Sequence, residues 1–431
     1  MPATDDDDVP LERAHDRRRL PARRARPQTA LAPGAPEPLS SDVISLQRKA
    51  LINGGAAAVL TGLIGFIVLS TTGWGLSAPS NSTSSPPPSS PPSCAPAFEV
   101  LPTVDPKDGG NLLLGVSALS ATDAWAVGGS GDPIDPSQTL YEHWDGETWS
   151  AVDGPNPGTA LNELAAVDQI AADDAWAVGR TGSGFGDAPL ITHFDGATWD
   201  VQPIPAAVTD GALTALSAAA ADDIWAVGSS GDASLGLEHV LALHFDGTGW
   251  TSVDATSAAG GGRSMLFGVS ALASDDVWAV GYHHNEPLIL HFDGKRWRRS
   301  ATDVGGFLHA VAAVGTADVW AVGSPIQHFA GDTWVERGSV RDGTDLRGVA
   351  SVSGNDVWAV GFRSGGGDTV RAAVLRWDGG QWTSVAGEHV PGQDTLAAVT
   401  ALPDGTVIAV GARDGATGRM TLAIRGADCL G

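Results

Sequence analysis

The sequence predicts an all-β fold, a seven-bladed β-propeller of four-stranded blades, preceded by a disordered N-terminus and one transmembrane helix. Three observations predict it: a recurring tryptophan hexapeptide, a second motif after each full copy, and a spacing of about 40–50 residues between copies. A seventh, decayed copy reads GTVIAVG and has Ile408 at the tryptophan position. The hexapeptide, of the form D-x-W-A-V-G, stands at 123–128, 174–179, 223–228, 276–281, 318–323 and 356–361.

When the seven repeats are aligned, several positions, which we call columns, hold the same kind of residue in every repeat. They define the first two strands of each unit. In every copy a leucine stands twelve residues before the tryptophan position, a tiny residue ten before it and a glycine three after it. We expect the tiny residue on the innermost strand, where seven strands crowd the axis. We expect the tryptophan to fill the space between neighbouring blades, because aromatic side chains bury the largest area per residue. The tiny residues are Gly115, Ala166, Ala215, Gly268, Ala310, Gly348 and Ala398.

The second motif supplies the outer two strands. It reads HFDGKRW at 291–297 and recurs in the first six units. In the fourth unit the apolar runs LFGVSAL, VWAVG, LILHF and the run from Trp297 are separated by Gly and Asp. These runs have the length and composition of strands, and no long helical periodicity with caps is present. Four strands per unit at this period are typical of a propeller blade.

The seventh unit ends near Gly426 without a fourth strand of its own. The stretch AFEVLPTV at 97–104 aligns with TWDVQPIP at 198–205, the fourth strand of blade 2, and places Phe98 at the tryptophan position. We expect this N-terminal strand to complete blade 7, which removes the open edge of the ring. The propeller domain is then 94–431.

Three segments precede the propeller. Residues 1–50 mix Asp-rich and Arg-rich runs with Pro, and are expected to be a disordered cytoplasmic segment. Residues 51–76 are apolar for long enough to form a transmembrane helix, and the basic residues before them place that side in the cytoplasm. Residues 77–93 form a Ser/Pro-rich stalk. A cleaved signal peptide is the alternative to the anchor.

The net charge of the chain after residue 50 argues against one class of partner, nucleic acid. Residues 1–50 contain nine of the 25 Lys and Arg residues and eight of the 50 Asp and Glu residues, which leaves 16 basic and 42 acidic residues for the rest. Such an acidic domain repels phosphate backbones, so nucleic acid is not an expected partner.

The two cysteines, Cys94 and Cys429, bracket the propeller. We expect a disulfide between them, because closure of the ring by the N-terminal strand brings both to the same strand end. Such a bond persists outside the cytoplasm. Two unrelated free thiols are the alternative.

The repeats resemble those of bacterial β-propeller repeat proteins with recurring D-x-W-A-V-G and H-F-D-G-x-x-W motifs, loosely allied to kelch and galactose-oxidase-like propellers. The similarity covers residues 97–426. It implies the propeller fold and leaves the activity open, because propellers host many unrelated functions. A galactose-oxidase-like copper site would need tyrosines and a cysteine cross-linked to one of them, but the chain has only Tyr141 and Tyr282.

The histidines and aspartates of the repeat columns are expected to be structural. The five column histidines belong to five different blades, too far apart to share one ion, so no metal, no cofactor and no catalytic residue is predicted. The aspartate before glycine in the second motif favours a tight turn, and the aspartate two before each tryptophan fits the turn between the first two strands. The histidines are His143, His193, His244, His291 and His328.

Binding is expected in the loops between the second and third strands, which vary most and share one face with the blade-to-blade connections. The loop YHHNEP at 282–287 is the only one with adjacent histidines. Arginines on the same face would meet an anionic ligand; a solvated loop and isolated surface charges are the alternatives. The candidates are Tyr282, His283, His284 and Glu286, with Arg180, Arg363, Arg371, Arg413 and Arg419.

The sequence therefore predicts a monomeric, membrane-anchored extracellular propeller, with its N-terminus in the cytoplasm. It would act as a non-catalytic binding or scaffold module for a protein or a cell-envelope glycan. The alternative is a polysaccharide-processing enzyme, a hydrolase or lyase, that uses the variable-loop face. A deep pocket with paired carboxylates on different blades would favour the enzyme, whereas a shallow, uneven rim would favour binding.

Overall fold

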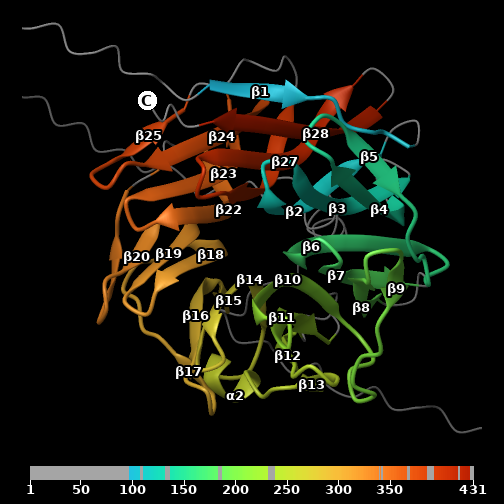
Figure 1. Cartoon of the computed structure of the whole chain (residues 1–431). Coiled ribbons are helices and arrows are strands. Elements are labelled where there is room, and N and C mark those ends of the chain that lie inside the picture. Colours follow the sequence, from blue (N-terminus) through green and yellow to red (C-terminus); the bar gives the residue numbers. More distant parts are fainter. Residues whose placement is uncertain are drawn as a thin grey trace, which may run out of the picture. The chain divides into compact units, whose positions relative to one another are not determined.

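The propeller domain consists of seven antiparallel four-stranded sheets that surround one axis, each sheet forming one blade (Figure 1). In blades 1 to 6 each strand pairs with the next along the chain. The expected all-β fold of seven four-stranded blades is confirmed. The computed structural model describes residues 97–106, 110–131, 136–182, 187–231, 238–338, 340, 343–365, 369–385, 393–415 and 418–427.

Within each blade, the strands are given in order from the innermost, next to the axis, to the outermost. Blades 1 to 3 consist of β2 (Leu112–Ser120), β3 (Asp123–Gly131), β4 (Pro136–Trp144), β5 (Trp149–Val152), β6 (Leu161–Ala171), β7 (Asp174–Gly182), β8 (Asp187–Phe194), β9 (Trp199–Val201), β10 (Ala212–Ala220), β11 (Asp223–Ser230), β12 (His239–Phe245) and β13 (Trp250–Ser252). Blades 4 to 6 consist of β14 (Ser264–Ala273), β15 (Asp276–His283), β16 (Glu286–Phe292), β17 (Trp297–Arg299), β18 (Phe307–Gly315), β19 (Asp318–Ser324), β20 (Gln327–Phe329), β21 (Trp334–Glu336), β22 (Thr344–Ser353), β23 (Asp356–Ser364), β24 (Val370–Trp377) and β25 (Trp382–Ser384). Blade 7 consists of β26 (Asp394–Ala401), β27 (Thr406–Gly415), β28 (Gly418–Ala427) and β1 (Ala97–Leu101), and the short helix α2 (Thr256–Ala259) precedes blade 4.

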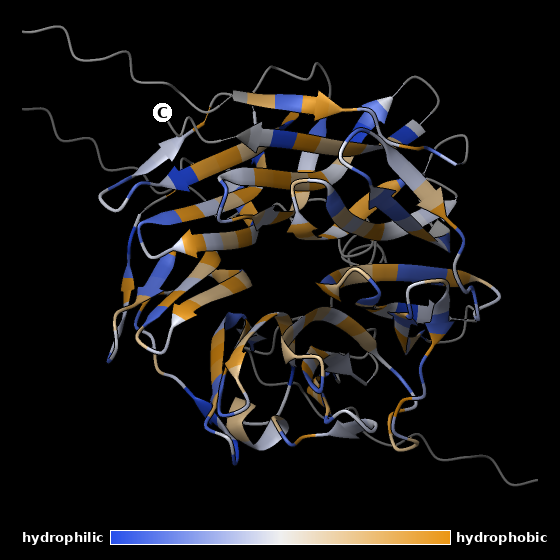
Figure 2. Cartoon of the chain, viewed as in Figure 1, coloured by the Kyte–Doolittle hydropathy of each residue, from blue (hydrophilic) through white to orange (hydrophobic). Residues whose placement is uncertain are grey.

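The hydrophobic core is divided among the interfaces between blades. Seven clusters of buried apolar residues each combine side chains of two neighbouring blades. Trp278 of blade 4, for example, is 3% exposed and makes a T-shaped contact with Trp334 of blade 5 at 5.6 Å. Figure 2 shows the apolar residues distributed along the strands of every blade. The repeated tryptophan therefore fills the space between blades, as the sequence predicts.

The constant small residues are required by close backbone contacts. A Cβ added at Gly115 would lie 2.7 Å from the Cα of Ala166 in the next blade, so the inner strands meet at this column. A Cβ added at Gly281 would overlap the carbonyl oxygen of Met265 on the inner strand of its own blade. All seven column glycines make this second contact. It coincides with a β-bulge in the inner strand of every blade.

The N-terminal strand closes the ring. β1 pairs antiparallel with β28, Ala97 standing opposite Ala427, and forms the outermost strand of blade 7. Phe98 is 4% exposed and lies T-shaped against Trp358 of blade 6 at 5.7 Å. This is the contact that outer-strand tryptophans make elsewhere, for example Trp382 with Trp320. First and last parts of the domain are thereby held in one sheet.

Several expectations from the sequence concern residues that the structure does not describe. The segments 1–50, 51–76 and 77–93, and both Cys94 and Cys429, lie outside the described residues. Among the described residues, the structure contains no apolar helix of the length needed to span a bilayer.

Candidate binding site

The repeated histidine and aspartate form one structural unit within each blade. His291 Nε2 lies 2.8 Å from Asp276 Oδ1, and the imidazole stacks on Trp278 at 4.2 Å. The same pair recurs at 2.7–2.9 Å in blades 1, 2, 3 and 5. In blade 6, Arg376 replaces the histidine. These aspartates directly follow the turn between the first two strands, as the first residues of the second strand, and their carboxylates reach the third-strand histidine.

The aspartate of the second motif forms the tight turn that the sequence predicts. Asp293 Oδ1 accepts hydrogen bonds from the backbone N–H groups of Lys295 and Arg296 at 3.1 and 3.0 Å. The Arg298 guanidinium and these N–H groups lower the pKa of Asp293 to about 2. These columns therefore stabilise the blades. Within the described residues, no group of three or more His, Cys, Asp or Glu side chains is placed to hold a metal ion.

The predicted histidines occupy the hairpin between β15 and β16. His284 and Asn285 adopt positive φ values of 49° and 72° at its tip, and His283 pairs with Glu286 across it. The two imidazoles lie 4.3 Å apart. His283 Nε2 donates to the carbonyl oxygen of Gly261 at 2.6 Å, which ties the hairpin to the connection before blade 4.

Tyr282 does not join the histidines, because neighbouring residues of a strand point to opposite faces. Its side chain is 7% exposed and contacts residues of the inner strands instead. The predicted set is therefore divided between two surfaces, with Glu286 exposed at the start of β16.

The predicted arginines belong to blades 2, 6 and 7, and so to other sheets than the blade 4 hairpin. Arg180 is held by two carboxylates, Glu163 at 3.0 Å and Asp187 at 2.9 Å. These carboxylates raise the pKa of Arg180 in spite of its burial. Arg363 stands opposite Arg371 on β24, and Arg413 opposite Asp394 on β26.

A larger group of side chains, which we call the rim arc, lies at the loop-face ends of blades 3 to 6. Glu238 directly precedes the third strand of blade 3, and the other members stand near the start of an inner strand or near the end of a second strand in blades 4 to 6. Each contacts at least one other member, so that together they form one connected network. The rim arc consists of Glu238, Arg263, Phe267, Tyr282, Phe307, His309, Asp345, Arg347 and Phe362.

The first half of the rim arc surrounds Tyr282. Arg263 donates to the buried Glu238 carboxylate at 3.0 Å, and its guanidinium lies 5.7 Å from the centre of the Tyr282 ring. The Tyr282 ring also lies 5.7 Å from Phe267 and 6.1 Å from Phe307. Burial raises the pKa of Tyr282 above its ordinary value. Phe307 is 40% exposed and presents an apolar surface to solvent.

The second half of the rim arc is a balanced set of charges. His309 lies 5.3 Å from Phe267, and its Nε2 is 3.3 Å from Asp345 Oδ1. Arg347 donates to Asp345 Oδ2 at 2.8 Å and lies 5.5 Å from the Phe362 ring. Burial lowers the pKa of His309. Burial would raise the pKa of Asp345, but His309 and Arg347 outweigh it and lower that pKa. Asp345 is therefore ionised, with Arg347 as its counter-ion.

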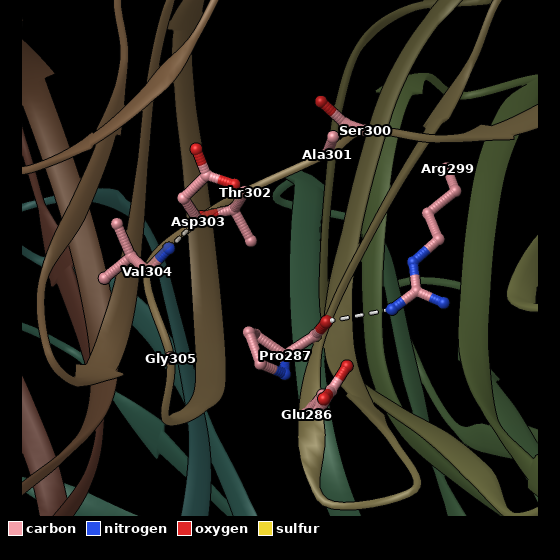
Figure 3. A pocket seen from close by; sticks show the side chains of 9 residues that line it. All are labelled: Glu286, Pro287, Arg299, Ser300, Ala301, Thr302, Asp303, Val304 and Gly305. Carbon is pink, nitrogen blue, oxygen red and sulfur yellow. Dashed lines mark hydrogen bonds between the residues drawn. The ribbon is translucent and has the colours of Figure 1, made fainter.

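A pocket of about 460 Å³ lies beside the rim arc, and we call it the blade 4 pocket (Figure 3). Its walls come from the start of β16, the end of β17 and the connection to blade 5. Its two carboxylates, Glu286 and Asp303, thus belong to one blade and the connection that follows it. The lining residues are Glu286, Pro287, Arg299, Ser300, Ala301, Thr302, Asp303, Val304 and Gly305.

The sequence contains a signal for the rim arc in the columns next to the constant ones. At these positions the packing of the blade requires no particular side chain. Large or charged residues are concentrated there in blades 4 to 6. The residue after the constant leucine is Leu114, Ala165, Thr214, Phe267, His309, Arg347 and Ala397 in blades 1 to 7. The residue after the constant glycine is Gly129, Arg180, Ser229, Tyr282, Ser324, Phe362 and Ala412.

No protein-family model matches this chain, and no curated protein matches it in sequence. Solved propellers are similar in fold. YCF48 bound to D1 peptide is 15% identical with a TM-score of 0.52, over 78% of this chain and all of that one. Virginiamycin B lyase from Staphylococcus aureus is 9% identical with a TM-score of 0.54, over 77% and 99%. The RRP9 WD40 repeats are 9% identical with a TM-score of 0.51, over 78% and 99%. These likenesses establish a seven-bladed propeller, whereas the resemblance to kelch and galactose-oxidase repeats stays an expectation.

Proposed function

We propose that this chain is a non-catalytic module that binds a protein ligand at the rim arc, on the face of the variable loops. The observation that carries the proposal is the arc itself. It joins aromatic side chains and arginines of adjacent blades in one continuous set of contacts, on a scaffold whose geometry the ring fixes. Tyr, Phe and Arg are enriched at protein interfaces, and residues that need no rearrangement lose little entropy on binding.

The known propellers agree with a binding role without defining it. The solved YCF48 is bound to a D1 peptide, so a propeller of similar fold binds a peptide. The similar lyase represents the enzymatic alternative. The blade 4 pocket favours binding, because its carboxylates Glu286 and Asp303 do not come from different blades.

Photocrosslinking in cells tests the proposal. A benzophenone side chain placed at Phe307, in the full chain, is expected to capture a protein. The same group at Val335 is the matched control, since Val335 is 37% exposed on the outer strand β21. A protein adduct at position 307 alone supports the proposal. Equal adducts at both positions, a glycan adduct, or no adduct at position 307 would contradict it.

We further propose that the propeller stands outside the cell on the anchor 51–76 and the stalk 77–93. The basic residues before the anchor support this orientation. Protease added to intact cells is then expected to release a fragment that begins within the stalk. Protection of the propeller until lysis would contradict this orientation and leave the binding proposal to be tested separately.

A further inference from the structure

We propose that the blade 4 pocket is a subsite for a basic side chain, and that the ligand is a peptide segment with Lys or Arg near a large apolar residue. The inference rests on the proposed function and specifies its ligand. The apolar residue of the segment contacts Phe307, and the basic side chain enters the pocket between Glu286 and Asp303.

The pocket adjoins the rim arc through Pro287 and Gly305. Pro287 lines the pocket and is the cross-strand partner of Tyr282. The Tyr282 ring in turn lies 6.1 Å from Phe307. On the other wall, Gly305 lines the pocket two residues before Phe307 begins β18. An extended segment advances about 3.3 Å per residue, so neighbouring side chains of one ligand reach both places.

The charges of this surface favour a cation. In the rim arc, Arg263 is paired with Glu238 and Arg347 with Asp345, so their charges cancel. In the pocket, the exposed carboxylates of Glu286 and Asp303 have no hydrogen bond or ion pair within the described part of the chain. Figure 3 shows them on opposite sides of the pocket.

Arg299 also lines the pocket and offsets part of this negative charge. Its guanidinium is directed to the wall, where it donates to the carbonyl oxygen of Pro287 at 3.4 Å and lies 3.5 Å from His283 Nδ1. Two carboxylates therefore face one guanidinium. Since 42 acidic and 16 basic residues follow residue 50, the field of the whole domain also attracts a basic segment.

Selection from a phage-displayed library of random dodecapeptides, with the full chain in detergent micelles as target, tests the inference. Selected peptides are expected to carry Lys or Arg within about three positions of an aromatic or large aliphatic residue. Their affinity is then measured for wild type and variants at two salt concentrations. The double variant E286Q/D303N is expected to weaken binding about five- to thirtyfold, as for two exposed charge pairs.

Two further variants separate the possible outcomes. D332N/E336Q removes two exposed carboxylates from the outer edge of blade 5 and should leave the affinity unchanged. If F307A abolishes binding while E286Q/D303N has no effect, the basic subsite is refuted and the rim arc stands. If the selected peptides are acidic, the subsite is refuted as well. If no selected peptide responds to F307A, the proposed function fails together with the inference.

Discussion

At the scale of single residues, Glu142 on β4 is an acidic side chain buried in the core. It is fully buried, and burial together with the Asp105 carboxylate raises its pKa to about 8, against a lowering contribution from the Val104 N–H. The folded state therefore holds a neutral carboxyl where the unfolded chain, with a value near 4.5, holds a carboxylate. Between these two pH values the folded state binds more protons, so its stability decreases as pH rises.

The first prediction concerns Glu142→Gln, which keeps the shape and removes the ionisation. The free energy of unfolding of the wild type should fall by about 3–5 kcal/mol relative to this variant between pH 4.5 and pH 9. Urea titrations across this range measure it. The exposed Glu147→Gln in the same blade is the control and should follow the wild type. Parallel pH profiles of wild type and Glu142→Gln would contradict the buried neutral carboxyl.

The second prediction concerns the repeated tryptophan. Trp278 is 3% exposed and contacts His291 of its own blade and Phe329 and Trp334 of the next. Trp278→Ala should lower the free energy of unfolding by about 3–5 kcal/mol, the cost of a large cavity. Val335→Ala, an exposed position, should change it little. A melting temperature within error of wild type for Trp278→Ala would mean that blade packing does not depend on this ring.

At the scale of secondary structure elements, the β-bulge of each inner strand determines which residue the second strand accepts. The inner-strand carbonyl lies so close to the column glycine that no side chain fits. Two rim-arc residues of blade 4 stand at its bulge, Phe267 after Leu266 and Tyr282 after Gly281. The same backbone irregularity that requires glycine therefore positions Phe267 and Tyr282.

The third prediction compares two glycines. In Gly281→Ala the new Cβ meets the Met265 carbonyl oxygen, so the backbone must shift at a cost of about 1–3 kcal/mol or more. Gly315→Ala is the control, since nothing lies within 4 Å of the place that its new Cβ would occupy. Chemical denaturation of both variants measures the difference. Equal stabilities would show that the bulge relaxes freely.

At the scale of the whole molecule, stability depends on the closure of the ring by β1. Each interface is shared by two blades, so a missing outer strand in blade 7 exposes the core on both sides. Leu101 belongs to the cluster with blade 1 and Phe98 to the cluster with blade 6.

The fourth prediction tests this closure. Phe98→Ala should lower the free energy of unfolding by about 3–5 kcal/mol, because a buried aromatic is lost from the last interface. Glu99→Ala on the same strand is the control: its 3.6 Å contact with Arg425 is exposed and contributes little. If both variants unfold at the same denaturant concentration as wild type, β1 is not needed for the ring.

The fifth prediction is the disulfide between Cys94 and Cys429. Ala97 and Ala427 are paired across β1 and β28, three residues after one cysteine and two before the other. The chain between the cysteines is long, so the bond should stabilise the domain by about 4–5 kcal/mol on the chain-entropy account. Mass spectrometry of the digested, non-reduced protein should find the linked peptides. Two free thiols in protein from the cell envelope would contradict the prediction.

The blades follow from the sequence alone: their number, their four strands, the interblade tryptophan and the small residues at the axis. These follow from columns that recur in every unit, because every blade must meet the same neighbour in the same way. Phe98 shows the strength of this signal, since its alignment with the outer-strand tryptophans alone anticipates its contact with Trp358. Tyr282 and His283 stand next to each other in the chain, but their side chains point to opposite faces of the strand.

Which variable side chains contact one another depends on the tertiary structure. Phe267, His309 and Arg347 stand about 40 residues apart in the chain, and nothing in a single blade relates them. They meet because the ring places the same column of successive blades side by side at one end of the inner strands. Repetition in a sequence reports the contacts that all blades share, whereas a binding surface depends on the residues in which they differ.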